Sequence, residues 1–198
     1  MIVRPWERIT ANFNLYCKNE NQICIALILH PTLLDFFGKR MDYTWITDQI
    51  AVGGGIWNEE NMLEVVQAGI THIINMQVEF DDRPLAEPWE IKVLWVPIDD
   101  DFQLKSPEIF EYGTDFAREA LLDPKTRLYI HCAAGVHRAP MMALAVLCSL
   151  GWELEQAQTH ILERRFVVDW KDVYVESVRN FLRASAANDS IASSKGTL

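Results

Sequence analysis

Residues 128–140, LYIHCAAGVHRAP, decide the fold of this chain. The apolar run that opens them is typical of a buried strand, and residues 141–150 that follow are strongly helical. A loop with a cysteine, a glycine and an arginine therefore joins a strand to the N-terminus of a helix. Such an end carries unpaired N–H groups and partial positive charge, which together bind anions. The stretch thus predicts an anion cradle between a strand and a helix.

The side chains of the loop add chemistry to this cradle. Five residues separate Cys132 from Arg138, so the loop can wrap a tetrahedral anion that both side chains reach. Arg138 offers a planar fork for two oxygens, and the local field favours the nucleophilic thiolate form of Cys132. Gly135 permits a backbone conformation that bulkier residues resist, and His131 is expected to hydrogen-bond the loop. The residues expected to bind phosphate are Ala133, Ala134, Gly135, Val136, His137 and Arg138.

Around this loop the chain alternates short strands with helices. Strands are predicted at residues 44–46, 50–52, 70–76, 93–98 and 127–130, and helices between and after them, while residues 77–88 are polar and irregular. This alternation predicts an α/β fold with a central, mixed, mostly parallel sheet flanked by helices. Ligands bind beyond the carboxyl ends of such strands. The loop of Cys132 and the aspartates at positions 99–101, which both follow strands, are therefore expected to meet.

The chain is expected to have three parts. These are a partly helical N-terminal extension over residues 1–40, a globular domain over residues 41–184 and a flexible tail over residues 185–198. The extension is expected to pack on the domain, with a dimer contact or a membrane-surface patch as alternatives. The sequence leaves the oligomeric state open.

Composition narrows the classes of function. The 198 residues carry a formal net charge of −10, which argues against a nucleic-acid partner. The four cysteines match no zinc pattern, and neither a metal nor a cofactor is expected. No secretory leader is evident, and the apolar run at residues 23–29 falls short of the roughly 20 residues that span a bilayer. A cytoplasmic location is therefore expected.

Residues 131–138, HCAAGVHR, resemble the signature loop of the cysteine-based protein tyrosine phosphatases, and the compact dual-specificity group in particular. The resemblance extends from about residue 43 to residue 182 and includes residues 95–100, WVPIDD. It implies a dual-specificity phosphatase-like fold, with residues 41–184 as the catalytic domain. In the implied mechanism the Cys132 thiolate attacks phosphorus, Arg138 and the loop amides hold the equatorial oxygens, and an aspartic acid protonates the leaving oxygen.

The sequence offers three candidates for that acid. Side chains alternate along a strand, so Asp100 shares a face with Val96 and Ile98, and the family pattern also favours Asp100. Asp99 and Asp101 remain alternatives, because a run of aspartates can equally be a solvated turn.

Ala139 departs from the family pattern, in which a serine or threonine follows the arginine and helps the sulfur to leave. We therefore expect slow breakdown of the thiophosphate and burst kinetics. The Arg-Ala-Pro ending also resembles the glucan phosphatases of plants, whose loop has glycine where this chain has His137. Core or rim packing is expected for the aromatic side chains near the loop, and a sugar channel is the alternative; these are Trp57, Phe102 and Trp170.

These features favour a phosphatase for phosphoprotein, with phosphotyrosine as the first substrate and phosphoserine or phosphothreonine as further ones. A phosphoglucan or other non-protein phosphatase is the second hypothesis. A weakly active phosphate-binding module is the third, which Ala139 keeps open although Cys132 and Arg138 argue against it. A loop without lysine argues against phosphoinositides. A buried cysteine beside a helix cap is the structural alternative, which the combined spacing of His131, Cys132, Gly135 and Arg138 disfavours.

Overall fold

A computed structural model describes residues 41–195 of the chain. The extension expected over residues 1–40, with its predicted helix, lies outside the described residues. Among those residues, five strands form a single sheet, and they are β1 (Tyr43–Trp45), β2 (Ile50–Gly53), β3 (His72–Gln77), β4 (Lys92–Ile98) and β5 (Leu128–His131).

The sheet has the order β1-β2-β5-β3-β4. Only the β1–β2 pair is antiparallel, and β2, β5, β3 and β4 all run parallel. The predicted α/β class with a mixed, mostly parallel sheet is confirmed. Strand β5 lies in the middle, where Ile130 is paired with Val52 on one side and Ile74 on the other. The loop that follows β5 therefore leaves the sheet at its centre, where neighbouring loops can surround it.

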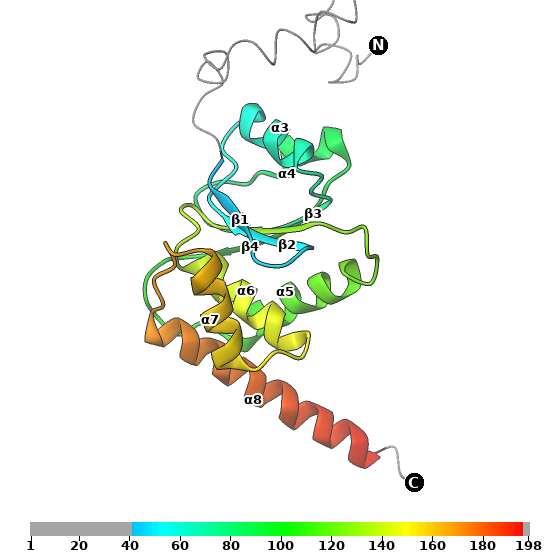
Figure 1. Ribbon diagram of the computed structural model, residues 1–198. Coiled ribbons are helices and arrows are strands. Elements are labelled where there is room, and N and C mark those ends of the chain that lie inside the picture. The colour runs from blue at the N-terminus through cyan, green and yellow to red at the C-terminus, as the bar shows by residue number, and fades with distance from the viewer. Residues whose placement is uncertain (1–40, 196–198) are drawn as a thin grey trace, which may run out of the picture. The chain divides into compact units, whose positions relative to one another are not determined.

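Helices cover both faces of the sheet (Figure 1). On one face lie α3 (Glu59–Gln67), α4 (Arg83–Ala86) and the short 3-10 helix η2 (Glu87–Trp89). On the other face lie α5 (Pro107–Ala120), α6 (Arg138–Ser149), α7 (Leu154–Arg164) and α8 (Asp172–Lys195). Each face has its own apolar core, one centred on α6 and the other beneath α3.

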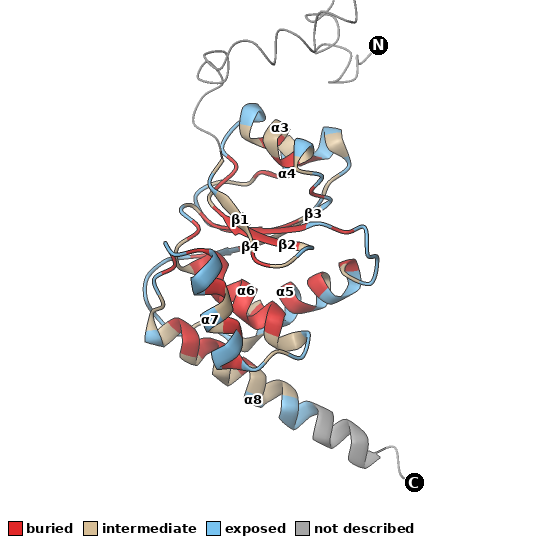
Figure 2. Cartoon of the chain, in the orientation of Figure 1, coloured by how far each residue is buried: buried red, intermediate tan, exposed pale blue. Residues whose placement is uncertain are grey.

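Helix α6 is the centre of the larger core. Its residues from Arg138 to Leu147 are all buried (Figure 2), and those after Arg138 carry no polar side chain. Packing against β5, α5, α7 and α8 accounts for this burial, since a helix that is hydrophobic on every side must be surrounded. Its N-terminus is thereby fixed at the edge of the sheet where β5 ends.

Local sequence signals explain several element boundaries. The side chain of Asn58 accepts a hydrogen bond from the amide of Asn61 at 2.8 Å and caps α3. Pro107 opens α5 at a position where its missing N–H costs nothing. Gly69 and Gly151 adopt positive φ just after α3 and α6, the conformation that glycine favours at a helix end.

Two segments differ from the sequence-based expectation. Residues 83–88, expected to be irregular, form α4 and most of η2, which are too short to show a helical period in the sequence. Helix α8 also continues to Lys195, well beyond residue 184, where the domain was expected to give way to a tail. No helix among the described residues is long and apolar enough to cross a membrane.

Candidate active site

The loop between β5 and α6, residues 132–137, folds around the sulfur of Cys132. The amide of Gly135 points at Cys132 Sγ from 3.3 Å, and only 2% of Cys132 is exposed. Gly135 has a φ of +65°, and a Cβ there would lie 2.4 Å from the carbonyl carbon of Gly53. Glycine is required at this position because the turn is left-handed and the β2 backbone lies against it.

Arg138 is buried at the first turn of α6, and most of its hydrogen-bond donors are occupied. Nη1 donates to the carbonyl of Ile98 at 2.9 Å and to Glu79 Oε2 at 3.0 Å, and Nη2 donates to Glu79 Oε1 at 2.7 Å. A guanidinium has five N–H groups. Among the described residues, Nε has no hydrogen-bond partner, and one N–H of Nη2 is also left over. These two groups share one edge of the guanidinium, which is the edge that binds phosphate bidentately.

Glu79 determines which N–H groups of Arg138 are occupied and which are free. Its carboxylate occupies the far end of Arg138 and leaves the Nε edge available. The hydrogen bond from Arg138 lowers the pKa of Glu79. Burial acts to lower the pKa of Arg138, but Glu79 and the nearby Cys132 and Asp100 outweigh it, and the pKa is raised. Arg138 is therefore a permanent cation with a fixed orientation.

His131 lies beneath the loop and contacts a different partner from the one expected. Its Nε2 lies 2.8 Å from Asp82 Oδ2, and both side chains are fully buried. The Asn75 amide donates to Asp82 Oδ1 at 2.9 Å, and the ring of Tyr129 stacks on the imidazole at 5.2 Å. His131 was predicted to hydrogen-bond the loop. Instead, it anchors the end of β5 to the residue before α4.

Arg165, at the C-terminal end of α7, supports the loop from behind. Its Nε donates to the carbonyl of Gly135 at 2.9 Å, and Nη2 lies 3.4 Å from the carbonyl of Ala134. Asp42 receives two further hydrogen bonds, at 3.0 and 2.7 Å, and Thr44 Oγ1 receives one at 3.2 Å. All five donors of a side chain that is 2% exposed are thus used.

Asp100 is the aspartate that the structure brings to the cradle. Its Oδ2 lies 3.9 Å from Arg138 Nε and 3.0 Å from His137 Nδ1, and its Oδ1 accepts from the hydroxyl of Tyr174 at 2.9 Å. Asp101 instead forms an ion pair with Lys105, which lowers the pKa of Asp101. Asp99 is exposed to solvent.

Two of the three aromatic side chains considered for a substrate channel are exposed. Trp57 is 45% exposed and packs against Phe80 with ring centroids 6.0 Å apart and the rings tilted by 45°, and Phe102 is 48% exposed beside His137. Trp170 is only half-buried but packs against the larger core. Trp57 lies two residues after Gly55, whose amide donates to the carbonyl of Ala133 at 3.1 Å. Aromatic side chains therefore stand near both the start and the end of the loop.

The remaining predicted residues lie in or beside the loop. Ala133, Ala134 and Val136 form its backbone, and Ala139 is fully buried behind Cys132 in the larger core. Five supporting side chains carry no signal in the sequence, because their contacts join distant parts of the chain. They are Glu79, Asp82, Arg165, Asp169 and Tyr174.

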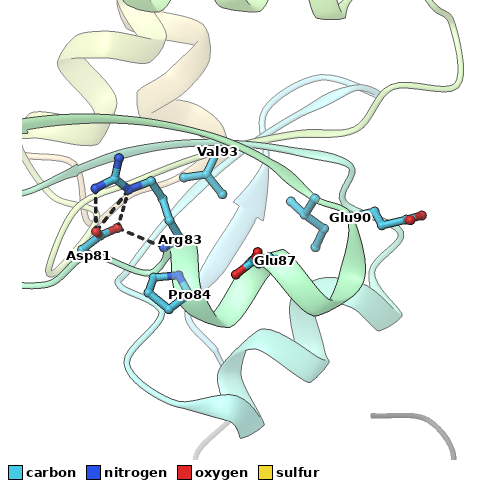
Figure 3. Close-up of a pocket in the computed structure, with 7 residues that line it drawn as sticks. Asp81, Arg83, Pro84, Glu87, Glu90 and Val93 are labelled. Carbon is cyan, nitrogen blue, oxygen red and sulfur yellow. Dashed lines mark hydrogen bonds and ion pairs between the residues drawn. The ribbon is translucent and has the colours of Figure 1, made fainter. Parts of the chain in front are cut away.

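Two cavities lie away from this loop. One, of about 590 Å³, borders Asp81, Arg83 and Glu87 beside β4, where Arg83 forms a two-pronged ion pair with Asp81 (Figure 3). The other, of about 560 Å³, lies along α7 and is lined by Trp152 and His160. In the described part of the chain, no group of three or more His, Cys, Asp or Glu side chains is arranged to hold a metal ion.

A buried cysteine beneath a glycine turn, an arginine with one free edge and a facing aspartate lie together where β5 ends. A model of the dual specificity phosphatase catalytic domain matches residues 58–184. The chain therefore belongs to the dual specificity phosphatase family, and the resemblance inferred from its loop is confirmed.

Relatives with assigned names agree with this family. Dual specificity protein phosphatase 26 of Bos taurus is 31% identical over 131 residues, which cover 61% of this chain and 62% of that protein. Protein phosphatase Slingshot homolog 3 of Mus musculus is 28% identical over 131 residues, which cover 65% of this chain and 19% of that protein. The chain thus spans less than two thirds of the length of either relative.

Solved structures support the same fold. The crystal structure of PTPMT1 aligns with a TM-score of 0.64 at 20% identity and covers 75% of this chain and 98% of that one. A human tyrosine phosphatase-like serine/threonine/tyrosine-interacting protein aligns with a TM-score of 0.63 at 18% identity, covering 74% and 99%. At these identities the likeness concerns the fold.

Proposed function

We propose that this protein hydrolyses phosphate monoesters through a phosphocysteine at Cys132, with phosphoprotein as its substrate. The observation that carries the proposal is the free edge of Arg138. A buried arginine has its other donors bound by Glu79 and Ile98, and its Nε edge lies between the loop of Cys132 and Asp100. A phosphoryl group supplies the oxygens that this edge lacks.

The proposed reaction has two steps. First, the Cys132 thiolate attacks phosphorus, the bond from phosphorus to the ester oxygen breaks, and protonated Asp100 gives its proton to the leaving oxygen. Water then attacks phosphorus, the Asp100 carboxylate takes the proton of that water, and the phosphorus–sulfur bond breaks to return the thiolate. Loop amides and the free edge of Arg138 hold the three equatorial oxygens during both steps.

Phosphoprotein is favoured as substrate because the relatives at about 30% identity are named protein phosphatases. The exposed Trp57 and Phe102 offer apolar surface to a phosphotyrosine ring or its neighbours. The same aromatic surface, together with Ala139, also supports a phosphoglucan as the second candidate, since aromatic faces stack on sugars.

A phosphate-release panel tests this proposal. The substrates are an aryl phosphate, phosphotyrosine and phosphoserine peptides and solubilised phosphoglucan, each offered to wild type, Cys132→Ser and Asp100→Asn. Cys148→Ser is the matched control, because Cys148 lies at the far end of α6 and burial raises its pKa to about 11. We expect Cys132→Ser to be inactive and Cys148→Ser to keep its activity. Full activity in Cys132→Ser would refute the mechanism, and efficient turnover of the glucan alone would replace phosphoprotein as substrate.

A further inference from the structure

We propose that His137 is a positioning residue that holds Asp100 over the phosphate cradle, so that acid catalysis in this chain depends on an imidazole in the phosphate-binding loop. The inference rests on the proposed function and concerns one contact within that site, the hydrogen bond between His137 and Asp100.

Both oxygens of Asp100 have hydrogen-bond partners, which come from two different parts of the chain. His137 Nδ1 lies 3.0 Å from Oδ2, and the hydroxyl of Tyr174, from α8, donates to Oδ1 at 2.9 Å. Burial, together with the Asp100 carboxylate, raises the pKa of Tyr174 to about 12, so this hydroxyl keeps its proton. With one hydrogen-bond partner on each oxygen, the plane of the carboxyl group is fixed. Oδ2 is also the oxygen that lies 3.9 Å from Arg138 Nε.

The imidazole of His137 is itself fixed on two further sides. Its Nε2 lies 3.5 Å from Asp169 Oδ2, and the ring of Phe102 meets it edge-on with centroids 5.4 Å apart. Lys171 pairs with Asp169 at 2.6 Å and lowers the pKa of that carboxylate, with His137 as a further cause. The His137 side chain is only 18% exposed. Because the ring is held in this way, the position of Asp100 depends on the position of the loop backbone at His137.

This arrangement joins three loops, two of which leave the same edge of the sheet while the third connects two helices. Asp100 lies between β4 and α5, His137 between β5 and α6, and Asp169 between α7 and α8. His137 directly precedes Arg138, so the segment that binds phosphate also carries the side chain that orients the acid. The amide of Asp169 donates to the carbonyl of Val136 at 3.2 Å, which fixes the third loop to the same segment.

The expected consequence is a loss that depends on the leaving group. An alkoxide or phenoxide of high pKa needs a proton as it departs, whereas the anion of an acidic phenol departs without one. Removing the imidazole should lower kcat/KM about 10- to 100-fold for poor leaving groups, because misplacing a reacting group by about 1 Å costs on the order of 10²-fold in rate. For acidic phenols, kcat/KM should change little, because the cradle and Cys132 remain.

The experiment measures kcat/KM for a series of aryl phosphates whose phenols range from acidic to weakly acidic. The proteins are wild type, His137→Ala, His137→Asn, Asp100→Asn and the double variant His137→Ala with Asp100→Asn. Asparagine places an N–H near the position of Nδ1 and should restore much of the loss. His160→Ala is the control, because His160 is also hydrogen-bonded, to the carbonyl of Ile46 at 2.7 Å, but lies on α7.

We expect a shallow dependence of log kcat/KM on leaving-group pKa for wild type, His160→Ala and His137→Asn. His137→Ala and Asp100→Asn should both show a steep dependence, and the double variant should be no worse than Asp100→Asn. A wild-type slope in His137→Ala would overturn the inference while leaving the proposed function intact. Equal losses across the whole series would also overturn it, because the imidazole would then act on phosphate binding. A shallow slope in Asp100→Asn would refute the acid role of Asp100, and with it the inference.

Discussion

Replacing Arg165 with methionine should disable the phosphate-binding loop without touching any residue that contacts the substrate. Methionine keeps the buried stem but removes all five donors, including the bond to the carbonyl of Gly135 at 2.9 Å and the longer contact to Ala134 at 3.4 Å. A hydrogen bond from a charged donor is worth about 1.5–3 kcal/mol. The partner carboxylate of Asp42 is 64% exposed, so water can replace the hydrogen bonds that Asp42 loses.

We therefore expect Arg165→Met to lower the free energy of unfolding by about 2–4 kcal/mol. This lies toward the lower end of the loss seen when a buried ion pair is broken. With the carbonyl of Gly135 released, the loop can also shift, and a displacement of about 1 Å at a reacting group costs on the order of 10²-fold in rate. Urea unfolding measures the first effect, and kcat/KM for an aryl phosphate measures the second.

Arg164→Met is the matched control, because Arg164 is the preceding residue, is exposed and contacts only His160 among the described residues. It should change the free energy of unfolding by less than about 0.5 kcal/mol, the usual range for surface substitutions. If Arg165→Met behaved like Arg164→Met in both assays, the role assigned to Arg165 would be refuted.

Three further predictions concern the chemistry of the site. Ala139→Ser should speed breakdown of the phosphoenzyme about 10- to 100-fold, because a hydroxyl hydrogen-bonds the departing thiolate; a burst unchanged in rapid-quench kinetics would contradict this. Glu79 has a pKa below its ordinary value of 4.5 because of Arg138, so its contribution to stability is present above that pH and is lost as the pH falls through the lowered pKa. Thermal melts at acidic pH should therefore decline less steeply for Glu79→Gln than for wild type, and parallel declines would argue against it. Iodoacetamide at neutral pH should alkylate Cys132 and spare Cys148, whose pKa is about 11; peptide mapping that finds Cys148 modified first would be the opposite result.

The centre of the fold could be predicted from the sequence because its signals are local. An apolar strand, a glycine turn and a helix without a polar face are contiguous in residues 128–150, and their geometry follows from the order of residue types. The cap at Asn58 and the start at Pro107 are local signals of the same kind. Chain order alone also placed the aspartates after β4 at the edge where the loop of Cys132 lies.

The supporting side chains of the site are encoded by distant contacts. His131 contacts Asp82 across 49 positions, Arg138 contacts Glu79 across 59, and Arg165 contacts Gly135 across 30. No periodicity or motif in a single sequence predicts such pairs. The sequence therefore predicted that His131 bonds to the neighbouring loop, whereas its partner is Asp82, the residue before α4. The pairing of His137 with Asp100, across 37 positions, escaped prediction for the same reason.

Trapping of the covalent intermediate tests the central claim most directly. Asp100→Asn, mixed with an aryl phosphate of an acidic phenol, should form the phosphocysteine rapidly and hydrolyse it slowly, since the base for water is missing. After an acid-free quench, mass spectrometry should find one phosphoryl group on the peptide that contains Cys132. Phosphate release by wild type with no phosphoryl group on Cys132 in this variant, at any time in the reaction, would contradict the account.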